Sequence, residues 1–193
     1  AGKTTVAARF LEERPGRTAW LSLDPSDTAA GRFVSYLAAA VGRAEPRLEA
    51  MVQDSLADGL LTEDCAGLLA ERLGPGWTIV LDDLHHLEPD APALGPLRAF
   101  LRYMPADALA VLVSRRMPSV DLFHGLLTDQ LSGVFDDELA FSLDETQALL
   151  EARQVDVDPR AVHGATGGWA AGIVFEALRR PASRSALPTT EGP

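Results

Sequence analysis

Short apolar segments that alternate with helical ones constrain the fold of this chain most strongly. Three segments are rich in strand-forming residues and are bounded by proline, glycine or aspartate: residues 18–24, 77–83 and 109–114. The third is a continuous apolar run, which is typical of a strand buried on both faces of a parallel sheet. Strands that alternate with helices predict an α/β fold with a parallel sheet.

Apolar residues recur at helical spacing in the segments between and after these strands. This spacing predicts helices over residues 4–13, from an N-cap at Asp27 to Gly42, and over 62–73, 94–103 and 122–131. The segment between residues 42 and 62 is less regular and is interpreted as partly helical. A last short strand is predicted over residues 138–141.

The chain changes character after this last predicted strand. Residues 142–145 read S-L-D-E, the form of a capping box, so a helix is predicted to begin at Leu143. Two more helices are predicted over residues 159–165 and 169–179, separated by a Gly-Gly pair. We therefore expect three parts: a nucleotide-binding domain over 1–141, a helical subdomain over 142–180, and a linker or disordered tail over 181–193.

Composition excludes several classes of function. The chain has 193 residues, a net charge of −11 and a pI near 4.7. Binding to nucleic acid needs a basic footprint, so this segment is not expected to bind DNA or RNA directly. No apolar run approaches the length of a membrane span. Cys65 is the single cysteine, so no internal disulfide can form, and a reducing, cytoplasmic location is expected.

The first five residues match the second half of the phosphate-binding loop motif G-x-x-x-x-G-K-[ST]. In such a loop Gly2 and Thr5 flank the phosphates, Lys3 reaches the β- and γ-phosphates, and the Thr4 hydroxyl is a ligand of Mg²⁺. Lys3 is the only lysine in the chain, which favours a chemical role for it. The first half of the loop and the strand before it are absent. We therefore expect a fragment of a longer protein, with an affinity for nucleotide that is open to question.

Two aspartates end the second predicted strand, about eighty residues after the loop. Asp82 and Asp83 match the Walker B element of P-loop proteins, in which a carboxylate at the tip of a strand faces the phosphates. Asp82 is predicted to hold Mg²⁺ through water, and Asp83 to orient or deprotonate an attacking water. Aspartates also end strands and begin turns for purely structural reasons. The loop upstream favours the functional interpretation.

Three further residues lie near this expected site. Arg115 follows the third strand and either faces the γ-phosphate, as a sensor of the nucleotide, or is a solvated or ion-paired arginine; both interpretations stay open. His85 and His86 follow the aspartates, but no further ligand at zinc-like spacing accompanies them. Packing or hydrogen bonding is the better interpretation of these histidines, and no metal other than Mg²⁺ is predicted.

Several motifs together resemble those of one family, and they cover nearly the whole chain. The motifs are G-K-T-T (2–5), A-W-L-S-L-D (19–24), I-V-L-D-D-L-H-H-L (79–87), L-V-S-R (112–115) and G-W-A-A-G-I (168–173). The series resembles the STAND ATPases. Within them it is most similar to the nucleotide-binding domain of large ATP-dependent LuxR-type transcriptional activators of the maltose-activator type.

The resemblance implies a P-loop NTPase fold, bound ATP or ADP, and Mg²⁺. It implies that Lys3 and Thr4 hold nucleotide and metal, that Asp82 and Asp83 form Walker B, and that Arg115 is the first sensor. It also implies domains outside this chain that bind an inducer and DNA. Such proteins are switches: ADP holds them inactive, inducer and ATP favour an open form that self-associates, and slow hydrolysis resets them.

Two other functions are compatible with the motifs. A metabolic P-loop enzyme, such as a small-molecule kinase, would use the same loop and aspartates but needs an acceptor site and a lid. No arginine-rich lid segment is present, and the helical end of the chain favours the switch. The second possibility is a protein that binds nucleotide without hydrolysing it.

Overall fold

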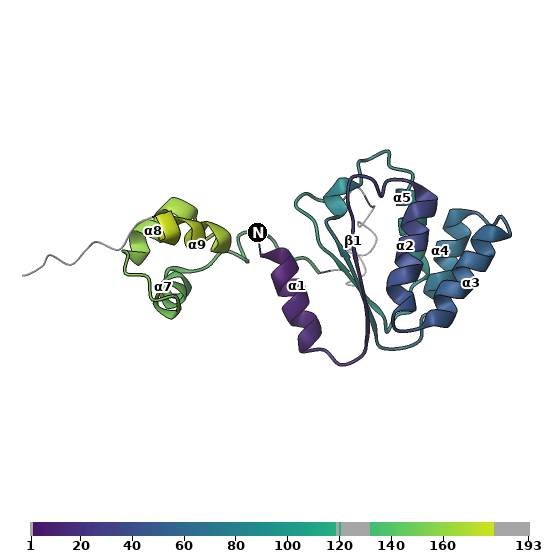
Figure 1. The fold of residues 1–193 in the computed structure, drawn as a ribbon, viewed down its shortest axis with the longest axis horizontal. Helices are drawn as coiled ribbons and strands as arrows, with labels where there is room; N and C mark the ends of the chain where they lie inside the picture. Colours follow the sequence, from purple (N-terminus) through teal and green to yellow (C-terminus); the bar gives the residue numbers. More distant parts are fainter. Residues whose placement is uncertain (1, 119, 121–131, 180–193) are drawn as a thin grey trace, which may run out of the picture. The chain divides into compact units, whose positions relative to one another are not determined.

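The computed structural model of the chain describes residues 2–118, 120 and 132–179 (Figure 1). The chain divides into two units, one of residues Lys3–Ser132 and one that holds Gly133–Pro193 together with Ala1–Gly2. The predicted helix over 122–131 and the predicted tail over 181–193 lie outside the described residues.

The first unit alternates helices and strands, as the apolar pattern predicts. In chain order its elements are α1 (Lys3–Glu12), β1 (Arg17–Ser22), α2 (Ala30–Gly42), α3 (Pro46–Ala57), α4 (Thr62–Glu71), β2 (Trp77–Asp82), the 3₁₀ turn η1 (Leu84–His86), α5 (Leu94–Tyr103) and β3 (Leu109–Leu112). The strands form a parallel sheet in the order β1-β2-β3. The predicted α/β fold with a parallel sheet is therefore confirmed.

Helices cover both faces of this sheet. Helix α1 lies on one face, and α2 to α5 lie on the other (Figure 1). Because successive side chains of a strand point to opposite faces, the residues of β2 divide between two apolar clusters. Ile79 and Leu81 pack against the helices of the larger layer, whereas Val80 packs against Ala7 of α1. Every residue of β2 is buried, which makes it the central strand.

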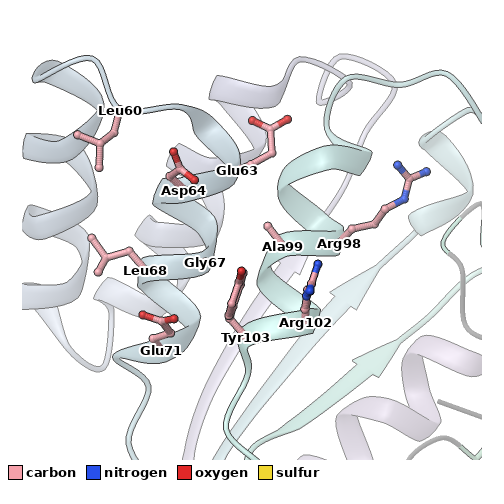
Figure 2. Close-up of a pocket in the computed structure, with 10 residues that line it drawn as sticks. All are labelled: Leu60, Glu63, Asp64, Gly67, Leu68, Glu71, Arg98, Ala99, Arg102 and Tyr103. Carbon is pink, nitrogen blue, oxygen red and sulfur yellow. The ribbon is translucent and has the colours of Figure 1, made fainter. Parts of the chain in front are cut away.

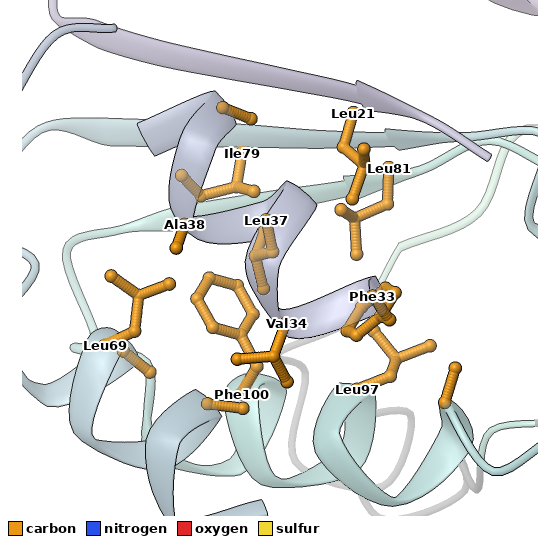
Figure 3. Close-up of a cluster of buried hydrophobic side chains, with 14 of the residues drawn as sticks. Leu21, Phe33, Val34, Leu37, Ala38, Leu69, Ile79, Leu81, Leu97 and Phe100 are labelled. Atoms are coloured by element: carbon orange, nitrogen blue, oxygen red, sulfur yellow. The ribbon is translucent and has the colours of Figure 1, made fainter. Parts of the chain in front are cut away.

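The larger cluster lies between the sheet and α2, α4 and α5 (Figure 3). Helix α2 contributes Phe33, Val34 and Leu37, which recur at helical spacing and are fully buried. They meet Leu69 of α4 and Phe100 of α5. Each buried side chain of this size contributes about 1.5–3 kcal/mol relative to an exposed one, so this layer holds most of the hydrophobic stabilisation of the unit.

Two details differ from the expected burial. The helical spacing of the first helix includes Val6 and Phe10, yet both are exposed and the buried residue of α1 is Ala7. Its small side chain lets the helix approach the sheet closely. β3 is predicted to be buried on both faces, but each of its four residues is only half-buried. Within the described residues β3 pairs with β2 alone, so its other edge lacks a neighbouring strand.

The second helix begins later than predicted. Its N-cap is Ala29 rather than Asp27, and no side chain caps the first turn. Asp27 instead closes a turn with Asp24: its amide donates to the Asp24 carbonyl (3.0 Å), and its carboxylate accepts from the Asp24 amide (2.9 Å). Asp27 therefore fixes the loop after β1.

Three helices form the second unit: α7 (Leu143–Ala152), α8 (Pro159–Thr166) and α9 (Ala170–Arg179). They close around Leu150, Val162, Ile173 and Ala177. The predicted capping box is present, because the Ser142 hydroxyl accepts from the Glu145 amide (3.2 Å) and the Glu145 carboxylate accepts from the Ser142 amide (2.8 Å). The pKa of Glu145 lies below its ordinary value, because its carboxylate accepts hydrogen bonds from the Ser142 amide and from the Ser142 hydroxyl (2.9 Å).

The predicted strand over residues 138–141 is wrong. Residues 136–139 form a turn, in which the Leu139 amide donates to the Phe135 carbonyl (3.2 Å). Phe141 then donates its amide to the Gly168 carbonyl (2.8 Å), and its ring packs against the apolar cluster of the second unit. The apolar residues that suggest a strand therefore pack against helices instead of pairing with a strand.

The structure also describes the single cysteine and the lengths of the helices. Cys65 is buried in α4, and this burial raises the pKa of its thiol, as for an unreactive structural cysteine. In the part of the chain that the structure describes, the helices are too short or too polar to cross a lipid bilayer.

Removal of the Ser142 hydroxyl tests the capping box. We expect Ser142→Ala to destabilise α7 by about 1 kcal/mol, because the Glu145 amide loses its acceptor. Hydrogen exchange of the α7 amides, followed by NMR or mass spectrometry, should accelerate, while exchange in β2 should not change. Ser142→Thr keeps the hydroxyl and serves as the control. Equal α7 exchange in Ser142→Ala and in the unmodified chain would contradict the cap.

Candidate nucleotide site

Asp82 ends the central strand and is only 2% exposed. By alternation along β2 it shares the face of Val80, the face that α1 covers. One of its oxygens, Oδ1, accepts a hydrogen bond from the Asp83 amide (2.9 Å). The fold thus turns this carboxylate toward the beginning of α1.

The loop motif and the strand aspartate meet in space, as the predicted site requires. The Thr4 hydroxyl, in the first turn of α1, donates to Asp82 Oδ1 at 3.3 Å, across 78 positions of sequence. Lys3 is the first residue of α1 and is half-buried, and Thr5 is exposed on the same turn. Gly2 precedes the helix with a φ of 101°, a conformation that favours glycine. The roles of Gly2, Lys3 and Thr5 in binding stay predictions.

Asp83 has an unusual backbone for a residue with a side chain. Its φ and ψ are 57° and 34°, in the left-handed region. Neighbouring hydrogen bonds hold it there: the Leu84 amide donates to the Val113 carbonyl (3.0 Å), and the His86 amide donates to the Asp83 carbonyl (3.0 Å). This conformation ends the extended backbone of β2 at Asp82, so the Asp83 side chain stays 39% exposed and does not enter the apolar layer that holds Leu81. Non-glycine residues in this region are concentrated at functional sites.

The first histidine of the pair lies against Asp83. His85 Nδ1 is 3.6 Å from Asp83 Oδ1, and the exposed fractions of the two side chains are 13% and 39%. Burial lowers the pKa of the His85 imidazole, and His86 lowers it further, whereas Asp83 raises it. The sequence favours packing or hydrogen bonding for His85 but names no partner for it; the D-x-H spacing was the available signal for Asp83.

The segment after β3 is bonded to the same turn. Arg116 donates to the His85 carbonyl (2.9 Å) and to the Glu88 carboxylate (3.2 Å), although its side chain is largely exposed. Arg115 is exposed and, among the described residues, makes no hydrogen bond or ion pair. Its side chain contributes to the low pKa of His85. The sensor role of Arg115 stays a prediction.

The loop after β1 also lies at the carboxyl ends of the strands, because Ser22 of β1 pairs with Asp82 in the sheet register. Asp24 accepts a hydrogen bond from the Ser26 amide (2.6 Å). A hydrogen bond with the Ser26 side chain, together with this bond from the Ser26 amide, holds the pKa of Asp24 below its ordinary value. Asp24 is therefore a structural residue of the turn.

A groove of about 580 Å³ lies elsewhere in the first unit, between α4 and α5 (Figure 2). Carboxylates of α4 line one side and arginines of α5 line the other: Glu63, Asp64 and Glu71 against Arg98 and Arg102. Neither Thr4 nor the two aspartates of the strand end contribute to it. This groove is therefore distinct from the predicted nucleotide site.

The backbone of Asp83 allows a test that does not depend on any ligand. We expect Asp83→Gly to unfold at a higher denaturant concentration than Asp83→Ala, by about 1 kcal/mol, because only the alanine carries a Cβ in the left-handed region. Glu88, whose φ is not positive, is the matched control: there the alanine variant should be the more stable. Equal stability of the two Asp83 variants would contradict the left-handed conformation.

Comparison with known proteins supports the resemblance that the motifs indicate. No known family model matches the chain. Over 161 residues, 80% of its length, the chain is 30% identical to the HTH-type transcriptional regulator MalT of Vibrio cholerae, of which it covers 18%. It is 32% identical over 163 residues to MalT of Yersinia pestis and of Yersinia pseudotuberculosis, of which it covers 17%.

The chain thus spans less than a fifth of the length of the curated relatives that it matches. The similarity nevertheless extends over about four fifths of the chain itself. It therefore extends well beyond one short motif. The chain is a homologue of regulators of the MalT type, and the predicted resemblance to maltose-activator-type proteins is confirmed.

Proposed function

We propose that this chain is the nucleotide-binding part of a signal-responsive transcriptional regulator, in which exchange between ATP and ADP controls conformation and self-association. Inducer and DNA are bound by other domains of the full-length cytoplasmic protein. Two findings support the regulatory role: the similarity to MalT proteins, and the acidic charge of the chain, which is unsuited to direct contact with nucleic acid.

One observation carries the nucleotide assignment, the hydrogen bond between Thr4 and Asp82. Two residues separated by 78 positions are brought to 3.3 Å, one at the start of a helix and one at the tip of the central strand. Helix starts favour phosphate because their amides are unpaired and the helix dipole is positive there. In parallel α/β sheets, ligands bind beyond the carboxyl ends of the strands. The bond joins these two features at one place.

The donor atoms at this place suit Mg²⁺. Thr4 and Asp82 offer a hydroxyl and a carboxylate oxygen, the hard ligands that this ion prefers. Among the described residues no group of three or more His, Cys, Asp or Glu side chains gathers as a metal site. A site with two protein oxygens fits Mg²⁺, which retains several waters and is completed by phosphate oxygens. The bound ion would neutralise charge on the phosphates, while Thr4 and Asp82 hold its position.

Asp83 is suited to act on water rather than on metal. Its side chain is 39% exposed, whereas that of Asp82 is buried, and its left-handed backbone turns it away from the Thr4 contact. We assign it the general-base role for slow hydrolysis. Arg115, which is exposed after β3, is assigned as the sensor of the γ-phosphate. The similarity to regulators, together with the helical second unit, favours this switch over a small-molecule kinase.

Loss of the single lysine tests nucleotide binding. In the full-length protein we expect Lys3→Ala to weaken binding of ATP with Mg²⁺ by roughly 100-fold or more, because a charge-assisted contact to phosphate is lost. Arg9→Ala removes a cation from the same helix and should leave the affinity unchanged. Isothermal titration calorimetry gives both affinities. Unchanged affinity in Lys3→Ala would overturn the assignment.

The base role of Asp83 is tested by a variant that keeps its shape. Asparagine tolerates the left-handed region as aspartate does, but the side chain of Asp83→Asn cannot accept a proton. In the full-length protein we expect hydrolysis of bound ATP to slow by roughly 100-fold while ATP affinity stays the same. The active state should therefore last longer. Single-turnover assays with labelled ATP measure the rate, and equal rates in variant and unmodified protein would exclude the base role.

A further inference from the structure

The imidazole of His85 has an unsatisfied atom that faces Asp83. Its Nδ1 is buried and, among the described residues, has no hydrogen-bond partner within normal distance. A buried polar atom without a partner costs free energy, so such atoms are rarely left unpaired. The nearest oppositely charged group is Asp83 Oδ1, at 3.6 Å.

Hydrogen-bond chemistry fixes the direction of any bond between these groups. An ionised carboxylate only accepts, so the hydrogen must be on Nδ1 of the imidazole. The present distance exceeds that of a hydrogen bond by a few tenths of an ångström. Rotation about the last torsion of the aspartate is soft, because it joins sp³ and sp² carbons, so a small rotation brings the atoms together.

The backbones of both residues are held independently of this contact. Asp83 is fixed by hydrogen bonds of its own amide and carbonyl, and the His85 carbonyl accepts from Arg116 (2.9 Å). The side chains therefore face one another because of the turn itself. Their relative orientation does not require a ligand.

We infer that His85 is a positioning residue, which donates Nδ1–H to Asp83 and holds its carboxylate in one orientation toward the site. His86 differs: its ring centroid lies 4.3 Å from that of His85, with the ring planes tilted by 32°, and within the described turn it forms no ion pair with Asp83. The effect of His85 on hydrolysis rests on the proposed function, whereas the contact between His85 and Asp83 is present without nucleotide.

The contact is tested first in the 193-residue chain without nucleotide. The chain has four histidines, so selective ¹⁵N labelling gives few signals, and the signal lost in His85→Asn identifies His85. We expect its Nδ1 to have the shift of a protonated, neutral imidazole nitrogen. Asp83→Gly, which suits the left-handed backbone, removes the acceptor and should shift the tautomer toward Nε2–H. An Nε2–H tautomer that is the same in both proteins would overturn the inference.

The consequence is tested by single-turnover hydrolysis in the full-length protein. His85→Leu keeps the bulk but removes the donor, and we expect the rate to fall by roughly tenfold, as for loss of a hydrogen bond to a charged group, with ATP affinity unchanged. His85→Asn places an amide donor near the position of Nδ1 and should restore much of the rate. His86→Asn is the matched control and should behave as the unmodified protein.

The outcomes separate the two proposals. A rate in His85→Leu within twofold of the unmodified protein, or no recovery in His85→Asn, would overturn the positioning role while leaving ATP hydrolysis in place. A full-length protein that neither binds nor hydrolyses ATP would instead overturn the proposed function. In that case the ¹⁵N measurement still decides whether His85 donates to Asp83.

Discussion

Burial of β2 on both faces is the constraint on which the first unit depends. Because β2 pairs in parallel with β1 and with β3, the carboxyl ends of all three strands reach the same edge of the sheet. Apolar side chains suit a strand covered on both faces, and Thr78 is the one polar residue of β2 before its last residue. Asp82 is the first carboxylate after this run. It is buried where α1 begins, and its hydrogen bonds compensate for that burial.

Those parts of the fold that follow from local chemistry could be predicted from the sequence. The apolar runs locate β1, β2 and β3, and the S-x-x-E pattern locates the start of α7. Burial depends on neighbours and could not be predicted in the same way. The apolar run of β3 suggests two covered faces and two paired edges, yet its described surroundings supply one paired edge. The apolar residues over 138–141 likewise do not reveal their neighbours, since Phe141 packs against the helices of the second unit instead of pairing with a strand.

In the candidate site, too, some features could be predicted from the sequence and others could not. The meeting of Thr4 and Asp82 was predictable, because a loop before a helix and an acid after a parallel strand converge at one edge. The left-handed Asp83 was not, because aspartate adopts this conformation only occasionally, and the hydrogen bond from Leu84 to Val113 that holds it here joins residues distant in sequence. Its contact with His85 depends on that conformation. The D-x-H spacing alone would place the two side chains differently in a regular strand or helix.

The reversal of the backbone at Asp83 explains how two adjacent aspartates can have separate tasks. In a continuing strand the residue after Asp82 would point into the apolar layer that holds Leu81, where a carboxylate is unfavourable. The left-handed residue instead keeps the Asp83 carboxylate partly in solvent and beside an imidazole. Hydrogen bonds from Leu84 to Val113 and from Arg116 to His85 then join this turn to the segment after β3. The backbone of the turn that carries His85 is therefore bonded to the segment that carries Arg115 and Arg116.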